Sequence, residues 1–345
     1  MSEPGLPVEI GRIDRELGRL WEASGDTKTR ASLINLVIYT EDPASLETNT
    51  GLLSTIASQH AFRAILILAN PRAEKPGARA WISAHCHLAG KGGQQICSEQ
   101  ITFQLDGESA SALPSIVFSH LDSDLPLCFW SQAEFSEPPD DQLWSWVDRL
   151  IFDSRAWKNP GAQFALTRRI AGASGPVLCD LNWTRLQPWR FALANLFDHA
   201  AALQRIAEIS SVRIACCPES STTSLLLLGW LADRLGWTLQ PLLSVHSFAD
   251  SRGRTVSFET VCEGTSGMAE ITLGGSGFSF RLHREPDTGF FHATLHIEGA
   301  AEATLTLGAG RERLTDTLLA ELSRGGRHPL YTRAVSVIGP LLSEA

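Results

Sequence analysis

Tryptophan, arginine and small polar residues gather in the stretch CDLNWTRLQPWRFALANLFD, which spans residues 179–198. Tryptophan and arginine are enriched at the energetic centres of protein–protein interfaces. This composition therefore suggests recognition of another protein rather than the making or breaking of bonds. The candidate partner contacts in this stretch are Asp180, Asn182, Trp183, Arg185 and Arg190.

The second half of the stretch predicts a helix. Pro188 suits the first turn of a helix, where its missing N–H costs nothing. From Trp189 onward, apolar residues recur with helical spacing, so we expect Trp189 in the core and Arg190 off the apolar stripe. The stripe consists of Trp189, Ala192, Leu193, Leu196 and Phe197.

The preceding DLNWTR segment has no such pattern. We expect it in a loop or at a strand end, where binding groups often lie. Two interpretations stay open. The segment is either a recognition surface or a rigid buried corner in which Arg185 pairs with Asp180 or another buried acid.

Tryptophan is also concentrated upstream, since six of the ten tryptophans fall between residues 130 and 189. Trp144 and Trp146 are two positions apart, so on a helix they cannot both face the same core stripe. We therefore include Trp144 and Trp146 among the candidate partner contacts.

The segment PESSTTS, residues 218–224, lies between a predicted strand and a predicted helix. Backbone N–H groups at a helix N-terminus can hold a phosphate. The segment lacks the glycines and lysine of a P-loop, and the same residues also serve as ordinary helix caps. The candidate anion-binding residues are Ser220, Ser221, Thr222 and Thr223.

Histidine and cysteine give weaker signals. HCH at 85–87 places two histidines on one strand face without designated further ligands, and HATLH at 292–296 alternates like a strand, which separates its histidines by about 13 Å. Cys216 and Cys217 precede a predicted helix, but no local motif supplies a catalytic partner. We expect core residues here and no metal site.

No local sequence motif indicates a catalytic site. GAGRER, at 308–313, lacks the third glycine of a dinucleotide fingerprint and does not open a βαβ unit. The sequence contains no GxSxG, HExxH, CxxC or P-loop motif. We therefore expect neither an enzyme nor a bound cofactor.

The composition of the 345 residues further restricts the kinds of binding partner that we expect. A net charge of −9 disfavours general nucleic-acid binding and an anionic membrane surface. The N-terminus shows no signal-peptide pattern, and the longest apolar run, LLLLGWLA, is too short to span a bilayer. Seven scattered cysteines suggest buried thiols in a reducing cytoplasm.

Strands alternate with helices through the first two thirds of the chain, and short alternating segments follow from about residue 254. We predict an α/β fold, in which a mixed sheet with parallel portions and flanking helices precedes an antiparallel meander and terminal helices.

The break SRAWKNPGAQ suggests domains at 1–158 and 159–345. The predicted strands are 32–40, 62–70, 79–88, 95–105, 125–130, 150–154 and 211–217, and the predicted helices include 8–22, 43–58, 108–120, 139–150 and 161–173. We expect the glycine-rich segment AGKGGQ to join the strands 79–88 and 95–105 as a turn.

Nearly the whole chain resembles the OpcA family, the glucose-6-phosphate dehydrogenase assembly proteins of bacteria. The most specific stretches are DLPLCFW (124–130), VDRLIFDS (147–154) and DLNWTRLQPWR (180–190). The resemblance implies a non-catalytic partner that binds this dehydrogenase and favours its active oligomer in the oxidative pentose phosphate pathway. The alternative is a phosphometabolite sensor or enzyme that uses 218–224.

Overall fold

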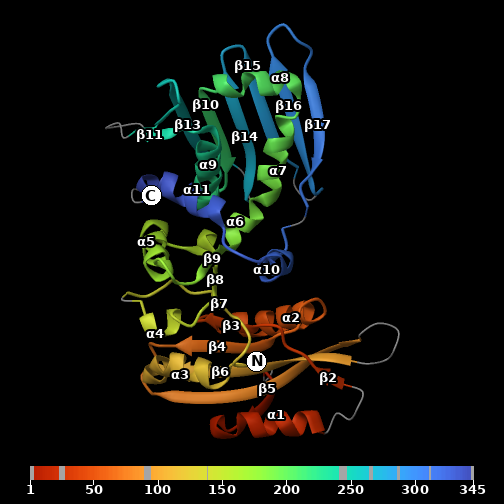
Figure 1. The fold of residues 1–345 in the computed structure, drawn as a ribbon, viewed down its shortest axis with the longest axis vertical. Helices are drawn as coiled ribbons and strands as arrows, with labels where there is room; N and C mark the ends of the chain where they lie inside the picture. The colour runs from red at the N-terminus through yellow and green to blue at the C-terminus, as the bar shows by residue number, and fades with distance from the viewer. Residues whose placement is uncertain are drawn as a thin grey trace. The chain divides into compact units, whose positions relative to one another are not determined.

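The computed structural model describes residues 4–22, 28–88, 95–137, 139–240, 247–263, 267–285, 288–310 and 312–342. The chain forms two compact units, each built of helices and a sheet (Figure 1). The first unit comprises residues 1–152, 166–179 and 314–326, and the second comprises 153–165, 180–313 and 327–345. The predicted α/β class is confirmed.

The first unit contains a nine-stranded sheet in the order β1-β5-β6-β4-β3-β7-β8-β9, with β2 paired to β6. Its strands are β1 Leu6–Val8, β2 Lys28–Arg30, β3 Asn35–Thr40, β4 Arg63–Asn70, β5 Gly77–Leu88, β6 Gln95–Asp106, β7 Leu127–Ser131, β8 Arg149–Phe152 and β9 Val177–Asp180.

The centre of this sheet is parallel. β3 pairs in parallel with β4 and β7, β4 with β6, and β7 with β8, whereas β5 runs antiparallel to β6. Parallel strands covered on both faces read as continuous apolar runs. The runs NLVIYT and RAILILAN of β3 and β4 are of this kind, and all but one residue of each is buried.

Helices of the first unit are α1 Ile13–Glu22, α2 Ser45–Ala57, α3 Leu113–Ser119, α4 Asp141–Trp144 and α10 Leu314–Leu322, with 3-10 turns η1 Ile10–Arg12 and η4 Gly107–Ala112. The helix α5, Pro160–Ala171, is divided between the two units.

The prediction of a helix over 139–150 was too long. The side chain of Asp140 caps the start of α4, and the chain turns after Trp144 so that Asp148 can accept a hydrogen bond from the backbone N–H of Leu127 beside β8.

The second unit contains an eight-stranded sheet in the order β11-β12-β13-β10-β14-β15-β16-β17. Its strands are β10 Ser211–Cys216, β11 Thr238–Gln240, β12 Ser247–Ala249, β13 Thr255–Cys262, β14 Met268–Gly275, β15 Phe278–Arg284, β16 Phe290–Ile297 and β17 Ala303–Gly308. β14 to β17 form the predicted antiparallel meander. β13 differs from the prediction, because β10 lies between β13 and β14 and pairs in parallel with β13.

Helices lie in front of this sheet in the view of Figure 1. They are α6 Leu181–Arg185, α7 Gln187–Leu196, α8 Ala200–Arg205, α9 Ser221–Leu235 and α11 Pro329–Leu342, with 3-10 turns η5 Ser154–Ala156, η6 Ile206–Glu208 and η7 Pro218–Ser220. α9 and α11 approach closely at Gly229, where an added Cβ would lie 2.6 Å from the carbonyl oxygen of Ala334. Only glycine permits this contact.

Cysteine pairing differs from the prediction of thiols alone. Cys86 and Cys97 lie opposite each other on β5 and β6 and form a disulfide. The other five cysteines are free, and four of them are buried, including Cys216 and Cys217. The glycine-rich segment 89–94, expected as the turn between β5 and β6, falls outside the described residues.

Within the described ranges, the structure contains no helix long and apolar enough to cross a membrane.

Candidate functional site

Asp180 is the centre of a buried corner in the second unit. It ends β9 and caps α6, because its Oδ1 accepts hydrogen bonds from the backbone N–H groups of Asn182 at 3.0 Å and Ser154 at 3.1 Å. Aspartate is among the favoured residues at this position. The residue is 2% exposed, and burial raises the pKa of its carboxyl to about 7.

Asn182 joins three elements of this corner. Its Nδ2 donates to the Ser154 hydroxyl of η5 at 3.0 Å, and its Oδ1 accepts from the Thr223 hydroxyl of α9 at 2.7 Å. Asn182 is completely buried. A buried amide must find partners inside the protein, and these two hydroxyls provide them.

Trp183 and Arg190 pack against each other. The Arg190 guanidinium lies 3.8 Å from the centre of the Trp183 ring, and its Nη1 donates to the Trp183 carbonyl at 2.8 Å. The edge of Trp183 also meets Tyr331 of α11, with ring centres 5.7 Å apart. Trp183 is 4% exposed, so its ring serves the packing of the second unit.

Arg185 forms an internal ion pair with Asp153. The closest nitrogen–oxygen distance is 2.7 Å, and 8% of the Arg185 side chain is exposed. Burial opposes the charged guanidinium, but the hydrogen bond and the charge of Asp153 outweigh burial and raise the Arg185 pKa. Of the two interpretations of the DLNWTR segment, the burial favours the rigid corner. The DLNWTR segment begins at a strand end, as expected, because Asp180 ends β9, and its other five residues form the helix α6 rather than a loop.

Most hydroxyl-bearing residues at the start of α9 are also buried. Ser220, Thr222 and Thr223 are buried, whereas Ser221 is exposed. The Thr223 hydroxyl is occupied by Asn182, and the cavity between this segment and α6 measures about 10 Å³, room for one water molecule. The anion-binding role of these residues stays a prediction.

A second candidate site is a pocket of about 260 Å³ in the first unit. From β3 the chain continues through α2 to β4 on one side, and it later reaches β7 on the other side of β3. The carboxyl ends of β3 and β7 therefore flank a topological switch point, where ligands bind in open α/β sheets. Tyr39, Glu41 and Ser131 line the pocket from these strand ends.

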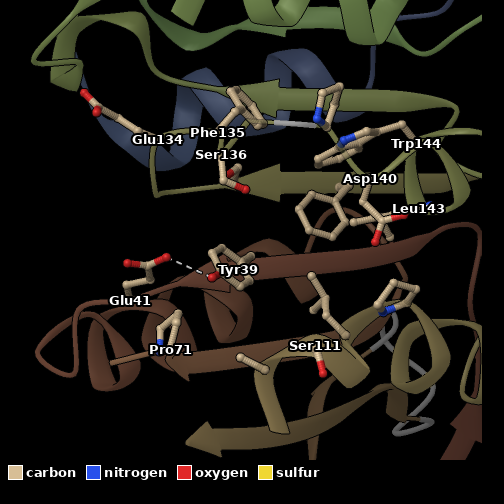
Figure 2. A pocket seen from close by; sticks show the side chains of 16 residues that line it. Tyr39, Glu41, Pro71, Ser111, Glu134, Phe135, Ser136, Asp140, Leu143 and Trp144 are labelled. Carbon is tan, nitrogen blue, oxygen red and sulfur yellow. Dashed lines mark hydrogen bonds between the residues drawn. The ribbon is translucent and has the colours of Figure 1, made fainter. Parts of the chain in front are cut away.

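Aromatic rings form much of the pocket wall. Tyr39 stacks beside Phe129 with ring centres 6.5 Å apart, and Trp144 meets Phe129 and Phe135 edge-on at 5.2 and 5.8 Å. Figure 2 shows Tyr39 on β3 and Trp144 on the facing side of the pocket. Trp144 is half-buried here, whereas Trp146 lies outside the pocket, packs on Phe118 and is 61% exposed.

Acidic groups are the only charged side chains among the described residues that line this pocket. They are Glu41, Glu134 and Asp140. The Tyr39 hydroxyl donates to Glu41 Oε1 at 2.9 Å (Figure 2). Burial, followed by the charge and hydrogen bond of Glu41, raises the Tyr39 pKa, so the phenol stays a neutral donor. Of the residues that line this pocket, the sequence indicated Trp144 alone, although two carboxylates directly after the buried run NLVIYT were a further usable signal.

The turn between β3 and α2 does not fit a dinucleotide. In dinucleotide-binding sheets this turn is glycine-rich, and the N-terminus of the helix faces the pyrophosphate. Here the turn reads TEDPAS, and Asp42 accepts hydrogen bonds from the Ala44 backbone N–H at 3.0 Å and the Ser45 hydroxyl at 2.9 Å. The carboxylates of Glu41 and Asp42 would repel a pyrophosphate.

Two domain families match consecutive parts of the chain. Residues 53–169 match the N-terminal domain of the glucose-6-phosphate dehydrogenase subunit. Residues 176–335 match the C-terminal domain of the same glucose-6-phosphate dehydrogenase subunit. The two matches belong together and cover most of the chain.

Two similar proteins bear the name OxPP cycle protein OpcA. The protein of Synechococcus elongatus is 25% identical over 319 residues, which are 85% of this chain and 70% of that protein. The protein of Synechocystis sp. is 28% identical over 193 residues, which are 55% of this chain and 40% of that protein.

Among solved structures, a levoglucosan dehydrogenase in complex with NADH and L-sorbose superposes with a TM-score of 0.49 and 11% identity, over 91% of this chain and 97% of that chain. A biliverdin reductase in complex with biliverdin and NADP⁺ from Synechocystis sp. gives a TM-score of 0.43 and 12% identity, over 91% of this chain and 100% of that chain. These similarities concern the chain trace alone.

Proposed function

The chain belongs to the OpcA family of glucose-6-phosphate dehydrogenase assembly proteins, and from this premise we propose that it binds glucose-6-phosphate dehydrogenase and favours the active oligomer of that enzyme. In this proposal the chain catalyses no reaction of its own. It acts in the cytoplasm, on the entry step of the oxidative pentose phosphate pathway.

The observation that carries the non-catalytic part of the proposal is the position of Asp42. Its carboxylate lies in the turn between β3 and α2, where it accepts hydrogen bonds from the backbone N–H of Ala44, the residue before α2, and from the hydroxyl of Ser45, the first residue of α2. A nicotinamide dinucleotide would need that helix end for its pyrophosphate, and a negative charge there opposes it. A negative charge in this turn is consistent with the proposed role, because it disfavours a dinucleotide at the place where sheets of this topology bind one.

The corner around Asp180 supports the same proposal. The Asn182 amide and the Arg185 guanidinium are bonded to side chains of the second unit, so they stiffen the corner instead of facing a substrate. Groups held this way can shape a surface for a protein partner.

The test uses the purified chain and the glucose-6-phosphate dehydrogenase of the same organism. We expect the two to co-elute in size-exclusion chromatography with light scattering, and the dehydrogenase peak to shift to a larger oligomer. We also expect faster NADP⁺ reduction at a glucose 6-phosphate concentration below the KM. An unrelated acidic protein serves as the control. Independent elution together with unchanged kinetics would refute the proposal.

A second measurement addresses catalysis. The chain alone, purified from cells that lack the dehydrogenase gene, should not reduce NADP⁺ with glucose 6-phosphate, and NADPH should not change its thermal unfolding. Turnover by this preparation, or saturable stabilisation by NADPH, would contradict the argument from Asp42.

A further inference from the structure

We propose that the pocket between the carboxyl ends of β3 and β7 receives one arginine side chain of the dehydrogenase. This inference rests on the proposed function and names the chemistry of one contact. The size of the pocket, its rings and its charge each narrow the choice of occupant.

The size of the pocket favours a single side chain. Its volume is about 260 Å³, whereas pockets for whole small molecules usually range from about 300 to 1,000 Å³. The residues that line it come from the ends of β3 and β7, from η4 and α3, and from the segment around α4, so folded elements of the first unit form the pocket.

The rings favour a cation with a flat face. The half-buried rings of Tyr39 and Trp144 lie on facing sides of the pocket, and Phe129 joins them at ring distances of 6.5 and 5.2 Å. The face of an aromatic ring attracts a cation within about 6 Å of its centre. A guanidinium can also stack on a ring, which an ammonium does less well.

The charges favour the same occupant. Glu41, Glu134 and Asp140 line the pocket, and no basic residue stands among the described residues that line it. Figure 2 shows the Glu41 carboxylate beside Tyr39, and Asp140 beside Leu143. A carboxylate can accept two parallel N–H groups of an arginine, so Glu41 and the rings together select arginine over lysine.

The anions that bind at other switch points are disfavoured here. Glu41 and Asp42 follow β3 directly, and Asp42 accepts hydrogen bonds within the turn that leads to α2. A phosphate in the pocket would meet the carboxylates of Glu41, Glu134 and Asp140. The occupant is therefore cationic, and its source in this proposal is the protein that the family binds.

A small probe tests the pocket without the dehydrogenase. The chain is labelled with ¹⁵N-tryptophan, and the Trp144 indole peak is assigned by its loss in Trp144→Phe. N-acetyl-arginine amide should shift this peak saturably, N-acetyl-lysine amide should shift it less, and N-acetyl-citrulline amide, which is neutral, should leave it unchanged. Glu41→Gln should weaken the arginine response. An absent response, or an equal response to citrulline, would overturn the pocket's assignment.

The dehydrogenase itself tests the partner. Glu41→Gln keeps the size of the side chain and an acceptor for the Tyr39 hydroxyl, and it should raise the Kd for the dehydrogenase about tenfold. The matched control is Glu47→Gln, which removes one exposed charge on α2 outside the pocket and should leave the Kd unchanged. Thermal unfolding of each variant verifies the fold.

The outcomes separate the two proposals. If the chain binds the dehydrogenase and Glu41→Gln binds it equally well, the pocket is not the contact, although the proposed function stands. If the unaltered chain does not bind the dehydrogenase, the proposed function and the partner named here both fail, and the arginine probe alone decides which chemistry the pocket accepts.

Discussion

The guanidinium of Arg185 lies 2.7 Å from the carboxylate of Asp153, and 8% of the Arg185 side chain is exposed. Removal of one partner of such a pair leaves the other charge poorly solvated. We expect Arg185→Ala to lower the free energy of unfolding by about 3 kcal/mol, near the lower end for buried pairs, since Asp153 is 24% exposed. Urea denaturation measures this change.

Arg155 provides the control for Arg185. It is an exposed arginine of η5, the turn that begins after Asp153, and Arg155→Ala should change the free energy of unfolding by less than about 0.5 kcal/mol. If the Arg185→Ala protein is stable and binds the dehydrogenase poorly, the structural role assigned to Arg185 is wrong. Arg185 would then be a direct contact with the dehydrogenase. A destabilised protein whose folded fraction binds normally would exclude direct recognition.

Titration of Asp180 should make the free energy of unfolding depend on pH. Burial raises its folded-state pKa to about 7, well above the value of an unfolded aspartate. Between about pH 4 and pH 7 the folded state therefore keeps a proton that the unfolded state has lost. The stabilisation that this proton provides is fully present below the pKa of the unfolded state and is lost as the pH rises through the folded-state pKa of about 7. Over this interval the free energy of unfolding falls by about 1.4 kcal/mol per pH unit.

Asp180→Asn isolates this contribution. The amide oxygen of the substituted side chain can still accept from the Ser154 and Asn182 N–H groups, and the side chain no longer ionises. Urea titrations from pH 4.5 to 8 should give a flatter profile for this variant than for the unaltered chain, with the largest gain above pH 7. Parallel profiles would mean that Asp180 is ionised in the folded protein throughout.

Trp189 should be a principal core residue of the second unit. It is 2% exposed, and its ring meets Phe291 of β16 at 4.6 Å. Truncation of a large buried aromatic side chain costs about 3–5 kcal/mol, and we expect this loss for Trp189→Ala. Phe191 lies on the same helix and is 61% exposed, so Phe191→Ala should cost about 1 kcal/mol or less. Equal losses in thermal or urea unfolding would contradict the stripe assigned to α7.

Periodic patterns predicted the elements that are long enough to show a period. The apolar stripe from Trp189 and the proline at 188 specify α7, and the apolar runs specify β3 and β4. Pairing between distant strands leaves no such signal. The insertion of β10 between β13 and β14 depends on long-range packing, so the sequence could suggest a meander but not this order.

The buried corner was harder to predict because its parts are short. α6 has five residues, too few for a helical stripe, and the useful signal was the capping aspartate at position 180. Composition drew attention to this stretch but did not decide between contact and support. That decision depends on Asp153 and Thr223, which come from other elements and meet α6 only after folding.

The disulfide between Cys86 and Cys97 should stabilise the first unit modestly. The two cysteines are 11 positions apart in sequence and lie opposite each other in a pair of long antiparallel strands. A cross-link over so short a loop contributes at most about 3 kcal/mol, and the strands already hold the two residues together. Dithiothreitol should therefore lower the thermal midpoint of the chain by a few degrees, and Cys86→Ser/Cys97→Ser should abolish that response. An equal response of the double variant would point to another cause.

Trp146 should contribute to partner binding without contributing much to stability. It is 61% exposed and packs on Phe118 with ring centres 5.1 Å apart, next to the pocket residue Trp144. An exposed tryptophan gives a large contact area at small entropic cost, and such residues dominate many interfaces. We expect Trp146→Ala to cost about 1 kcal/mol or less in unfolding and to raise the Kd for the dehydrogenase about 5- to 100-fold.

Two further variants make the effect of Trp146 specific. Phe290→Ala removes an exposed ring of the second unit, 48% exposed, and controls for a general loss of aromatic surface. Trp146→Phe should recover part of the affinity, because a smaller ring still covers the same position. A Trp146→Ala chain that is stable and binds the dehydrogenase as tightly as the unaltered chain would remove this surface from the interface.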